Sequence, residues 1–202
     1  MYCSELKEGE CAHLEGWAVW ITGLPGSGKS TIAKVLVREL REKNLRVQLL
    51  SVDMLRKVLT PRPTYSEEER KIVYDGLILI AQLLTENSVN VLIDATGNRR
   101  SYRNNARRRI KLFMEAYVHC PLDVCMIREK RRKLTLGAPR GVYRKAEKSQ
   151  SLTVPGVGVP YEVPFKPEIF VDSLRLTPKQ SAEKILKVIL QRFEKNRGIC
   201  EA

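Results

Sequence analysis

Along this chain short apolar runs alternate with longer stretches in which the apolar positions have helical spacing. The runs typical of buried strands are residues 17–22, 45–50, 89–93, 114–118 and 169–171. Amphipathic stretches separate them at residues 29–43, after Ser66, at residues 101–111 and after Pro121, and one more follows Thr177. Parallel neighbours need crossover connections, which helices supply. The pattern therefore predicts an α/β fold, a mostly parallel sheet with helices on both faces.

Two of these helices carry a start signal in the sequence. Ser66 is followed three residues later by Glu69, and Thr177 by Gln180, which is the spacing of a capping box. Pro178 would then occupy the first helical position after Thr177. We expect the helix after Ser66 to turn four apolar side chains inward, namely Leu77, Ile80, Leu83 and Leu84.

The length of 202 residues suits one domain of ordinary size. We expect a short tail at residues 1–15 and one domain at residues 16–202. Glycines and prolines interrupt residues 129–167, which predicts a loop-rich, movable lid that contains arginines. No run of eighteen apolar residues and no secretion-signal layout occurs, so we expect a cytoplasmic protein without a membrane partner.

The net charge says little about the binding partner, and the cysteines favour free thiols over a metal site. Lysine and arginine total 36 against 23 acidic residues, a net charge of +13, which favours anionic partners but equally describes a solvated basic surface. The five cysteines are scattered without paired spacing, which is typical of free thiols in a reducing compartment. Cys3, Cys11 and His13 lack a nearby fourth ligand, so we do not expect a metal there.

The strongest chemical signal lies between the first predicted strand and helix. Residues 23–30 read GLPGSGKS, which fits the phosphate-loop pattern GxxxxGK[ST] in its required context. Its backbone amides would face the β-phosphate of ATP, Lys29 would reach the β- and γ-phosphates, and the Ser30 hydroxyl would ligate Mg²⁺. The predicted ATP-binding set is Gly23, Leu24, Pro25, Gly26, Ser27, Gly28, Lys29, Ser30 and Thr31. A kinase is the favoured interpretation.

Two aspartates follow the next two predicted strands. Asp53 is the first choice for the catalytic base, and Asp94 is placed to hold magnesium. Either carboxylate could instead take the other role, or cap a turn. Arg128 begins a basic run that could neutralise charge on the transferring phosphoryl group. That run and the arginines of residues 99–109 could equally face solvent.

Taken together, these motifs resemble the adenylylsulfate (APS) kinase family of P-loop kinases over about residues 16–190. WITGL before the phosphate loop, PLDVC with Arg128, GVYRKA, PYE and the late TP with SA are similar to motifs of that family, in the same order. The resemblance implies transfer of the γ-phosphate of ATP to the 3′-hydroxyl of adenylyl sulfate, with Lys29, Asp53 and Arg128 as catalytic residues. Arg56, Tyr65 and Arg70 would contact that acceptor, and Lys145 lies in the lid. Dimers occur in the family, so a homodimer is a further expectation.

The departures from the family pattern fall on the acceptor side. The first aspartate of its DGD motif is Ser51 here, and its FISPxR stretch reads ATGNRR at residues 95–100. Asp94 has no counterpart in that pattern. From this stretch we retain Thr96, Gly97, Asn98 and Arg100 as candidate substrate-binding residues.

Three alternatives to an adenylylsulfate kinase stay open at this point. The first is a related kinase that phosphorylates another small anionic hydroxyl compound. The second is an RNA-directed kinase, which the low aromatic content of 6% disfavours. The third is a nucleotide-dependent switch with slow hydrolysis and no acceptor.

Overall fold

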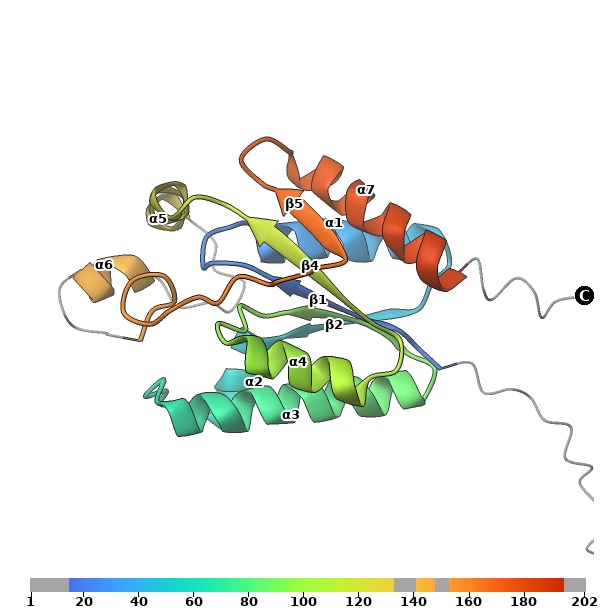
Figure 1. The fold of residues 1–202 in the computed structure, drawn as a ribbon, viewed down its shortest axis with the longest axis horizontal. Coiled ribbons are helices and arrows are strands. Elements are labelled where there is room, and N and C mark those ends of the chain that lie inside the picture. Colours follow the sequence, from blue (N-terminus) through green and yellow to red (C-terminus); the bar gives the residue numbers. More distant parts are fainter. Residues whose placement is uncertain (1–14, 133–140, 148–152, 195–202) are drawn as a thin grey trace, which may run out of the picture.

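The computed structural model describes residues 15–132, 141–147 and 153–194, and Figure 1 shows them as a layered α/β fold. In these ranges five strands form one parallel sheet in the order β2-β3-β1-β4-β5. Their bounds are β1 Ala18–Thr22, β2 Val47–Ser51, β3 Asn90–Asp94, β4 Phe113–His119 and β5 Ile169–Asp172. The predicted parallel α/β architecture is confirmed.

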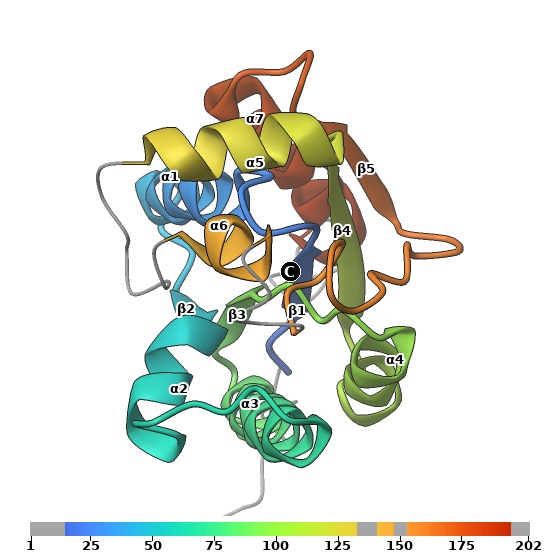
Figure 2. The ribbon, with the colours of Figure 1, turned by 90° about the vertical axis from the view of Figure 1, so that its left-hand side faces the viewer.

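Helices cover both faces of the sheet, as Figures 1 and 2 show. Helices α1 and α7 pack on one face, and α3 and α4 on the other. Helix α2, which the apolar pattern did not predict, starts directly after the last residue of β2. The bounds are α1 Lys29–Glu42, α2 Val52–Leu59, α3 Glu67–Glu86, α4 Arg100–Arg109, α5 Leu122–Arg131, α6 Val142–Glu147 and α7 Pro178–Ile189, and a π-helical turn follows at Leu190–Glu194.

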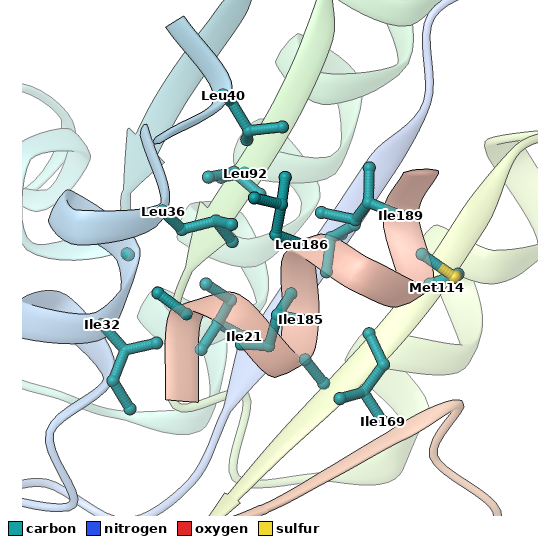
Figure 3. Close-up of a cluster of buried hydrophobic side chains, with 14 of the residues drawn as sticks. Ile21, Ile32, Leu36, Leu40, Leu92, Met114, Ile169, Ile185, Leu186 and Ile189 are labelled. Carbon is teal, nitrogen blue, oxygen red and sulfur yellow. The ribbon is translucent and has the colours of Figure 1, made fainter. Parts of the chain in front are cut away.

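The central strand β1 is buried along its whole length, because both of its faces are covered. Val19 and Ile21 point into the cluster that α1 and α7 close, part of which Figure 3 shows. Ala18 and Trp20 point into the cluster that α3 and α4 close. Burial on both faces fixes the end of β1, from which the phosphate loop departs.

The inward face of α3 differs from the prediction at two positions. Leu77 is buried and Leu84 is partly buried, but Ile80 is 37% exposed and Leu83 is 50% exposed, so the prediction was wrong for these two. At 3.6 residues per turn Leu83 falls on the side opposite the buried row, and Ile80 falls at the edge of that row. That row is made by Val73, Tyr74, Leu77, Ile78 and Ala81.

The two predicted capping boxes have different outcomes. Thr177 and Gln180 form a complete box at the start of α7, with Pro178 at the first helical position. At α3 the Ser66 hydroxyl accepts from the Glu69 amide at 3.2 Å, but the Glu69 carboxylate does not return to Ser66. The second half of that box was therefore predicted wrongly, because the carboxylate binds other groups nearer the site.

Some of the predictions concern residues outside the described ranges. They are the tail up to residue 14, with Cys3, Cys11 and His13, and residues 133–140 and 148–152 of the predicted lid. Within the described ranges no helix combines the length and apolarity needed to cross a bilayer.

Candidate active site

The phosphate loop joins the carboxyl end of β1 to the first turn of α1. Gly26 has φ +81°, and a Cβ there would lie 2.5 Å from the carbonyl oxygen of Cys125, so a larger residue would collide with backbone. The first turn of α1 has no acidic residue. Its amide groups and the positive end of the helix are therefore available to an anion at this point.

Lys29 is buried at the first position of α1 and reaches back across the loop. Its Nζ donates to the Leu24 carbonyl oxygen at 2.8 Å. Burial lowers the pKa of Lys29, while the Asp94 and Asp53 carboxylates act in the opposite direction. The ammonium is thus held within the loop that would surround the phosphates.

The two predicted aspartates both lie close enough to Lys29 to act on its pKa. Asp94 ends β3 and is hydrogen-bonded to the Ser30 side chain, and Asp53 lies in the first turn of α2. Burial raises the pKa of both carboxyls, and the positive charge of Lys29 opposes the rise. Ser51, at the end of β2, is the register partner of Asp94. A carboxylate therefore stands directly across from the position where the family pattern has its first aspartate.

The donor set of Ser30, Asp53 and Asp94 consists of oxygen atoms, which is the chemistry that Mg²⁺ selects. Among the described residues no group of three or more His, Cys, Asp or Glu side chains is arranged to hold a metal ion by itself. The residues thus fit magnesium that arrives with phosphate oxygens and keeps water ligands, rather than a closed protein cage.

A cavity of about 1020 Å³ extends from the phosphate loop past both aspartates to a wall made by α2, α3 and the segment before α3. This volume is at the upper end of the range for single small-molecule sites, so a nucleotide and a second molecule can share it. The predicted residues that line it are Pro25, Gly26, Gly28, Lys29, Ser30, Thr31, Asp53, Arg56, Tyr65, Arg70, Asp94, Thr96 and Arg128.

The far wall of the cavity combines two guanidinium groups with one aromatic ring. Arg56 and Arg70 are both buried, and their guanidinium carbons lie 5.0 Å and 5.9 Å from the centre of the Tyr65 ring. Arg70 also donates to the carbonyl oxygens of Tyr65, at 3.1 Å, and of Thr153. Arg56, Tyr65 and Arg70 were predicted from the sequence as acceptor contacts, and the fold brings them together.

Other predicted residues lie behind the cavity wall. Gly23, Leu24 and Ser27 build the turn of the phosphate loop and do not line the cavity. Gly97 and Asn98 also lie outside the lining, although their neighbour Thr96 is part of it.

Residues 95–98 form a loop at the end of β3 that buried side chains brace. The Trp20 indole donates to the Ala95 carbonyl at 2.9 Å, and the Gly97 amide donates to the Tyr74 hydroxyl at 3.0 Å. The Thr22 hydroxyl donates to the Thr96 carbonyl at 2.6 Å. These contacts hold Thr96 at the cavity.

Arg100 points away from the cavity, toward the segment at residues 162–165. Its amide donates to a Glu162 carboxylate oxygen at 2.7 Å, and its guanidinium carbon lies 3.8 Å from the centre of the Phe165 ring. For Lys145 the structure describes the backbone, within α6, and not the side chain. Substrate contact by Arg100 or Lys145 stays a prediction.

Arg128 lines the cavity with its guanidinium already engaged. It donates to the Ser173 carbonyl at 2.8 Å and to the Ser173 hydroxyl at 3.1 Å, so α5 is tied to the turn after β5. Arg131 and Arg132 also line the cavity. This basic run therefore faces the site in part, whereas Lys133 lies outside the described residues.

The second basic run contains two arginines that serve the fold. Arg103 is almost fully buried, pairs with Glu115 at 2.5 Å and donates to the Gly97 carbonyl. Arg107 forms a two-pronged pair with Glu168, with distances of 2.5 and 2.8 Å. These ion pairs hold α4 against β4 and against the start of β5.

Two functional contacts were missed by sequence reasoning. The Tyr143 hydroxyl on α6 donates to the Pro25 carbonyl at 2.8 Å, which ties the start of the lid to the phosphate loop. The Glu69 carboxylate reaches Arg56 at 2.7 Å. Tyr143 stands in the GVYRKA motif, which was the available signal, whereas Glu69 was assigned to a helix cap.

A parallel sheet of order 2-3-1-4-5, a phosphate loop after its central strand and a cavity that reaches from that loop to an arginine-rich wall define a P-loop kinase. The model of the adenylylsulphate kinase family matches residues 15–172, and the chain belongs to that family. The family predicted from the motifs is confirmed.

Individual relatives match nearly the full chain. A probable adenylyl-sulfate kinase of Pyrococcus abyssi is 36% identical over 174 residues, 86% of this chain and 95% of the relative. An adenylyl-sulfate kinase of Rippkaea orientalis is 34% identical, with coverages of 85% and 90%. The structure of the Mycobacterium tuberculosis APS kinase CysC, in complex with AMPPNP and APS, matches with a TM-score of 0.77 and 28% identity, and covers 87% of this chain and 98% of that one.

Proposed function

We propose that this protein transfers the γ-phosphate of ATP to the 3′-hydroxyl of adenylyl sulfate. The observation that carries the proposal is one continuous cavity with the phosphate loop at one end and Arg56, Tyr65 and Arg70 at the other. A cationic and aromatic wall suits an acceptor that carries both negative charge and a base. The names of the relatives support the same acceptor.

In this proposal each residue near the phosphate loop has one role. Lys29 leaves the Leu24 carbonyl and neutralises the transferring phosphoryl group. Asp53, whose pKa burial raises, accepts the proton of the acceptor hydroxyl. Ser30 and Asp94 would hold Mg²⁺, which when bound would supply charge neutralisation at the phosphate oxygens. Arg128 exchanges its contact with Ser173 for the phosphates.

A second candidate acceptor, another small anionic hydroxyl compound, is favoured by one observation. The loop at residues 95–98, which the family pattern fills differently, is locked by Trp20 and Tyr74 and places Thr96 in the cavity. A different loop at an acceptor site changes which molecule fits, because specificity depends on the contacts of the pocket. An RNA acceptor is disfavoured, because Arg103 and Arg107 are engaged in ion pairs.

A coupled assay for ADP release tests the proposal directly. We expect ADP formation from ATP and magnesium to depend on added adenylyl sulfate, and the product to carry a new 3′-phosphate by mass spectrometry. Turnover with another hydroxyl compound from a panel, and none with adenylyl sulfate, would transfer the assignment to the second candidate. Failure of every acceptor, with no binding of ADP, would contradict a kinase altogether.

We also propose a homodimer through an apolar surface on α2 and α3. Its side chains are exposed although apolar: Val58 is 76% exposed, and Leu59, Ile72, Leu79 and Leu83 accompany it. Leu59 packs over Gly76, which joins the two helices into one surface. At its margin Lys71 and Asp75 form an ion pair of 2.5 Å.

Charge explains why a second copy is the occupant that this surface suits. The chain carries +13, which opposes self-association at basic faces, whereas the apolar surface has no charge and its paired margin cancels locally. We expect the dimer mass in light scattering after size exclusion, and the monomer mass for Ile72→Glu. Ile127→Glu, on the exposed side of α5, is the control and should remain a dimer. A monomeric wild type at about 100 µM, a concentration well above a micromolar Kd, would contradict this surface as a dimer interface.

We propose that the protein resides in a reducing cytoplasm. We also propose that its domain spans residues 16–202. Cys120 and Cys125 are buried and free, which is the usual state of thiols in such a compartment. Labelling of thiols in extracts made under alkylating conditions would test the first proposal, and limited proteolysis the second.

A further inference from the structure

Glu69 is the residue whose contacts the sequence least anticipated. One carboxylate oxygen, Oε1, accepts from Arg56 Nη1 at 2.7 Å. The other, Oε2, accepts from the amide and the hydroxyl of Thr64 at 2.5 and 2.8 Å and from the amide of Tyr65 at 3.1 Å. One side chain therefore connects α3, α2 and the segment between them.

Tyr65 adopts a backbone conformation that needs such support. Its φ is +57°, in the left-handed region that bulky residues rarely occupy. A conformation of this kind persists only where the surroundings impose it, and such residues concentrate at ligand sites. Glu69 binds the amide of Tyr65, and Arg70 binds its carbonyl at 3.1 Å, so both sides of the strained residue are fixed.

The charge of Glu69 is as important as its hydrogen bonds. Burial acts to raise the pKa of Glu69, but the hydrogen bonds from Thr64 and Tyr65 and the positive charge of Arg56 outweigh it and hold the pKa below its usual value. The carboxylate is thus ionised at neutral pH. Arg56 and Glu69 are both largely buried, and a buried ion pair constrains its members strongly when one partner is hydrogen-bonded elsewhere.

We propose that Glu69 is a positioning residue, whose carboxylate sets the Arg56 guanidinium and the Tyr65 ring in the geometry that binds the acceptor. The inference rests on the proposed function in that the Arg56 and Tyr65 end of the cavity takes the acceptor. Glu69 does not line the cavity and acts through these two residues. Loss of its charge releases Arg56 from its direction and Tyr65 from its strained backbone, while the phosphate loop is unchanged.

The test compares Glu69→Gln and Glu69→Asp with Glu68→Gln, an exposed acidic neighbour in the same helical turn. For Glu69→Gln we expect the KM of the acceptor to rise about 10- to 100-fold, the loss typical of a charged hydrogen-bond partner. The KM of ATP and the Kd of ADP should stay within about twofold, because only uniform acceptor binding is affected. Glu69→Asp, which keeps the charge, should recover part of the loss, and Glu68→Gln should match the wild type.

A second measurement reports on the pocket without turnover. In protein labelled with 3-fluorotyrosine, the ¹⁹F resonance of Tyr65, assigned with Tyr65→Phe, should shift in Glu69→Gln and not in Glu68→Gln. An unchanged acceptor KM, or an equal loss of ADP binding that signals a general structural defect, would overturn the role. If the wild type phosphorylates no acceptor, the proposed function is wrong, and the Tyr65 resonance still tests the role of Glu69. A resonance that does not shift in Glu69→Gln would then contradict the positioning role.

Discussion

Replacement of Gly97 by alanine tests how tightly the loop after β3 is packed. Gly97 has φ +50°, where an alanine costs about 1–2 kcal/mol relative to its usual conformations. The new Cβ would also lie 2.9 Å from a carbon of the Trp20 ring and 3.2 Å from Arg103 Cγ. Neither neighbour has freedom to move, because the Trp20 indole bonds to Ala95 and Arg103 is paired with Glu115. Overpacking of this kind costs about a further 1–3 kcal/mol.

The summed effect on the free energy of unfolding is therefore about 2–5 kcal/mol, which for a domain of this size lowers Tm by about 4–20 °C. Calorimetry or circular dichroism at fixed pH measures it. Gly141→Ala is the matched control, because Gly141 has φ +65° and, among the residues that the structure describes, the nearest atom would lie 3.9 Å from the new Cβ. It should show the backbone cost alone. A Gly97→Ala protein that melts within about 2 °C of the control would refute the reasoning from close contact.

Three further substitutions test the end of the cavity that would bind ATP, the phosphate donor. Lys29→Met should lower kcat about 10²- to 10³-fold in initial-rate assays at saturating ATP, and a rate near that of the wild type would refute its role. Asp94→Asn should weaken binding of magnesium with ADP about 10- to 100-fold by calorimetry. The same change should raise Tm at pH 7, because the folded-state pKa of Asp94 is raised and its ionised form costs stability above that pKa; the gain should shrink as pH falls through it. In the pH profile of kcat/KM, the fall in rate on the acidic side should reflect the raised pKa of Asp53. This fall should be absent from the residual activity of Asp53→Asn. If the variant keeps the fall at the same pH, Asp53 is a metal ligand instead.

The fold could be predicted from the sequence because burial imposes a period on each element. Strand β1 reads as a continuous apolar run since both of its faces are covered, and the phosphate loop is a local motif that needs no distant partner. Helix α2 was missed because it begins directly after Ser51, without a turn signal. On α3 the apolar residues exceed what one inward face can hold, so Ile80 and Leu83 were wrongly expected to be buried.

Most contacts of the site could not be predicted, because they join residues far apart in the chain. Arg128 meets Ser173, and Arg103 meets the carbonyl of Glu162, across 45 and 59 positions. Glu69 had a local interpretation as half of a capping box, and only the bend of the chain at Tyr65 brings Arg56 within its reach. Side-chain type showed that charges would be present, but their pairing depends on the tertiary fold.

The division of the cavity between strands has a consequence for how this protein can diversify. Groups that would hold the nucleotide come mainly from the phosphate loop and α1, whereas the opposite wall comes mainly from residues 56–70, which follow β2. Exchange of that one contiguous segment would rebuild most of the wall opposite the phosphate loop and leave the phosphate loop and Asp53 unchanged. With such a layout, evolution or protein design can change which acceptor is phosphorylated and keep the residues that bind ATP.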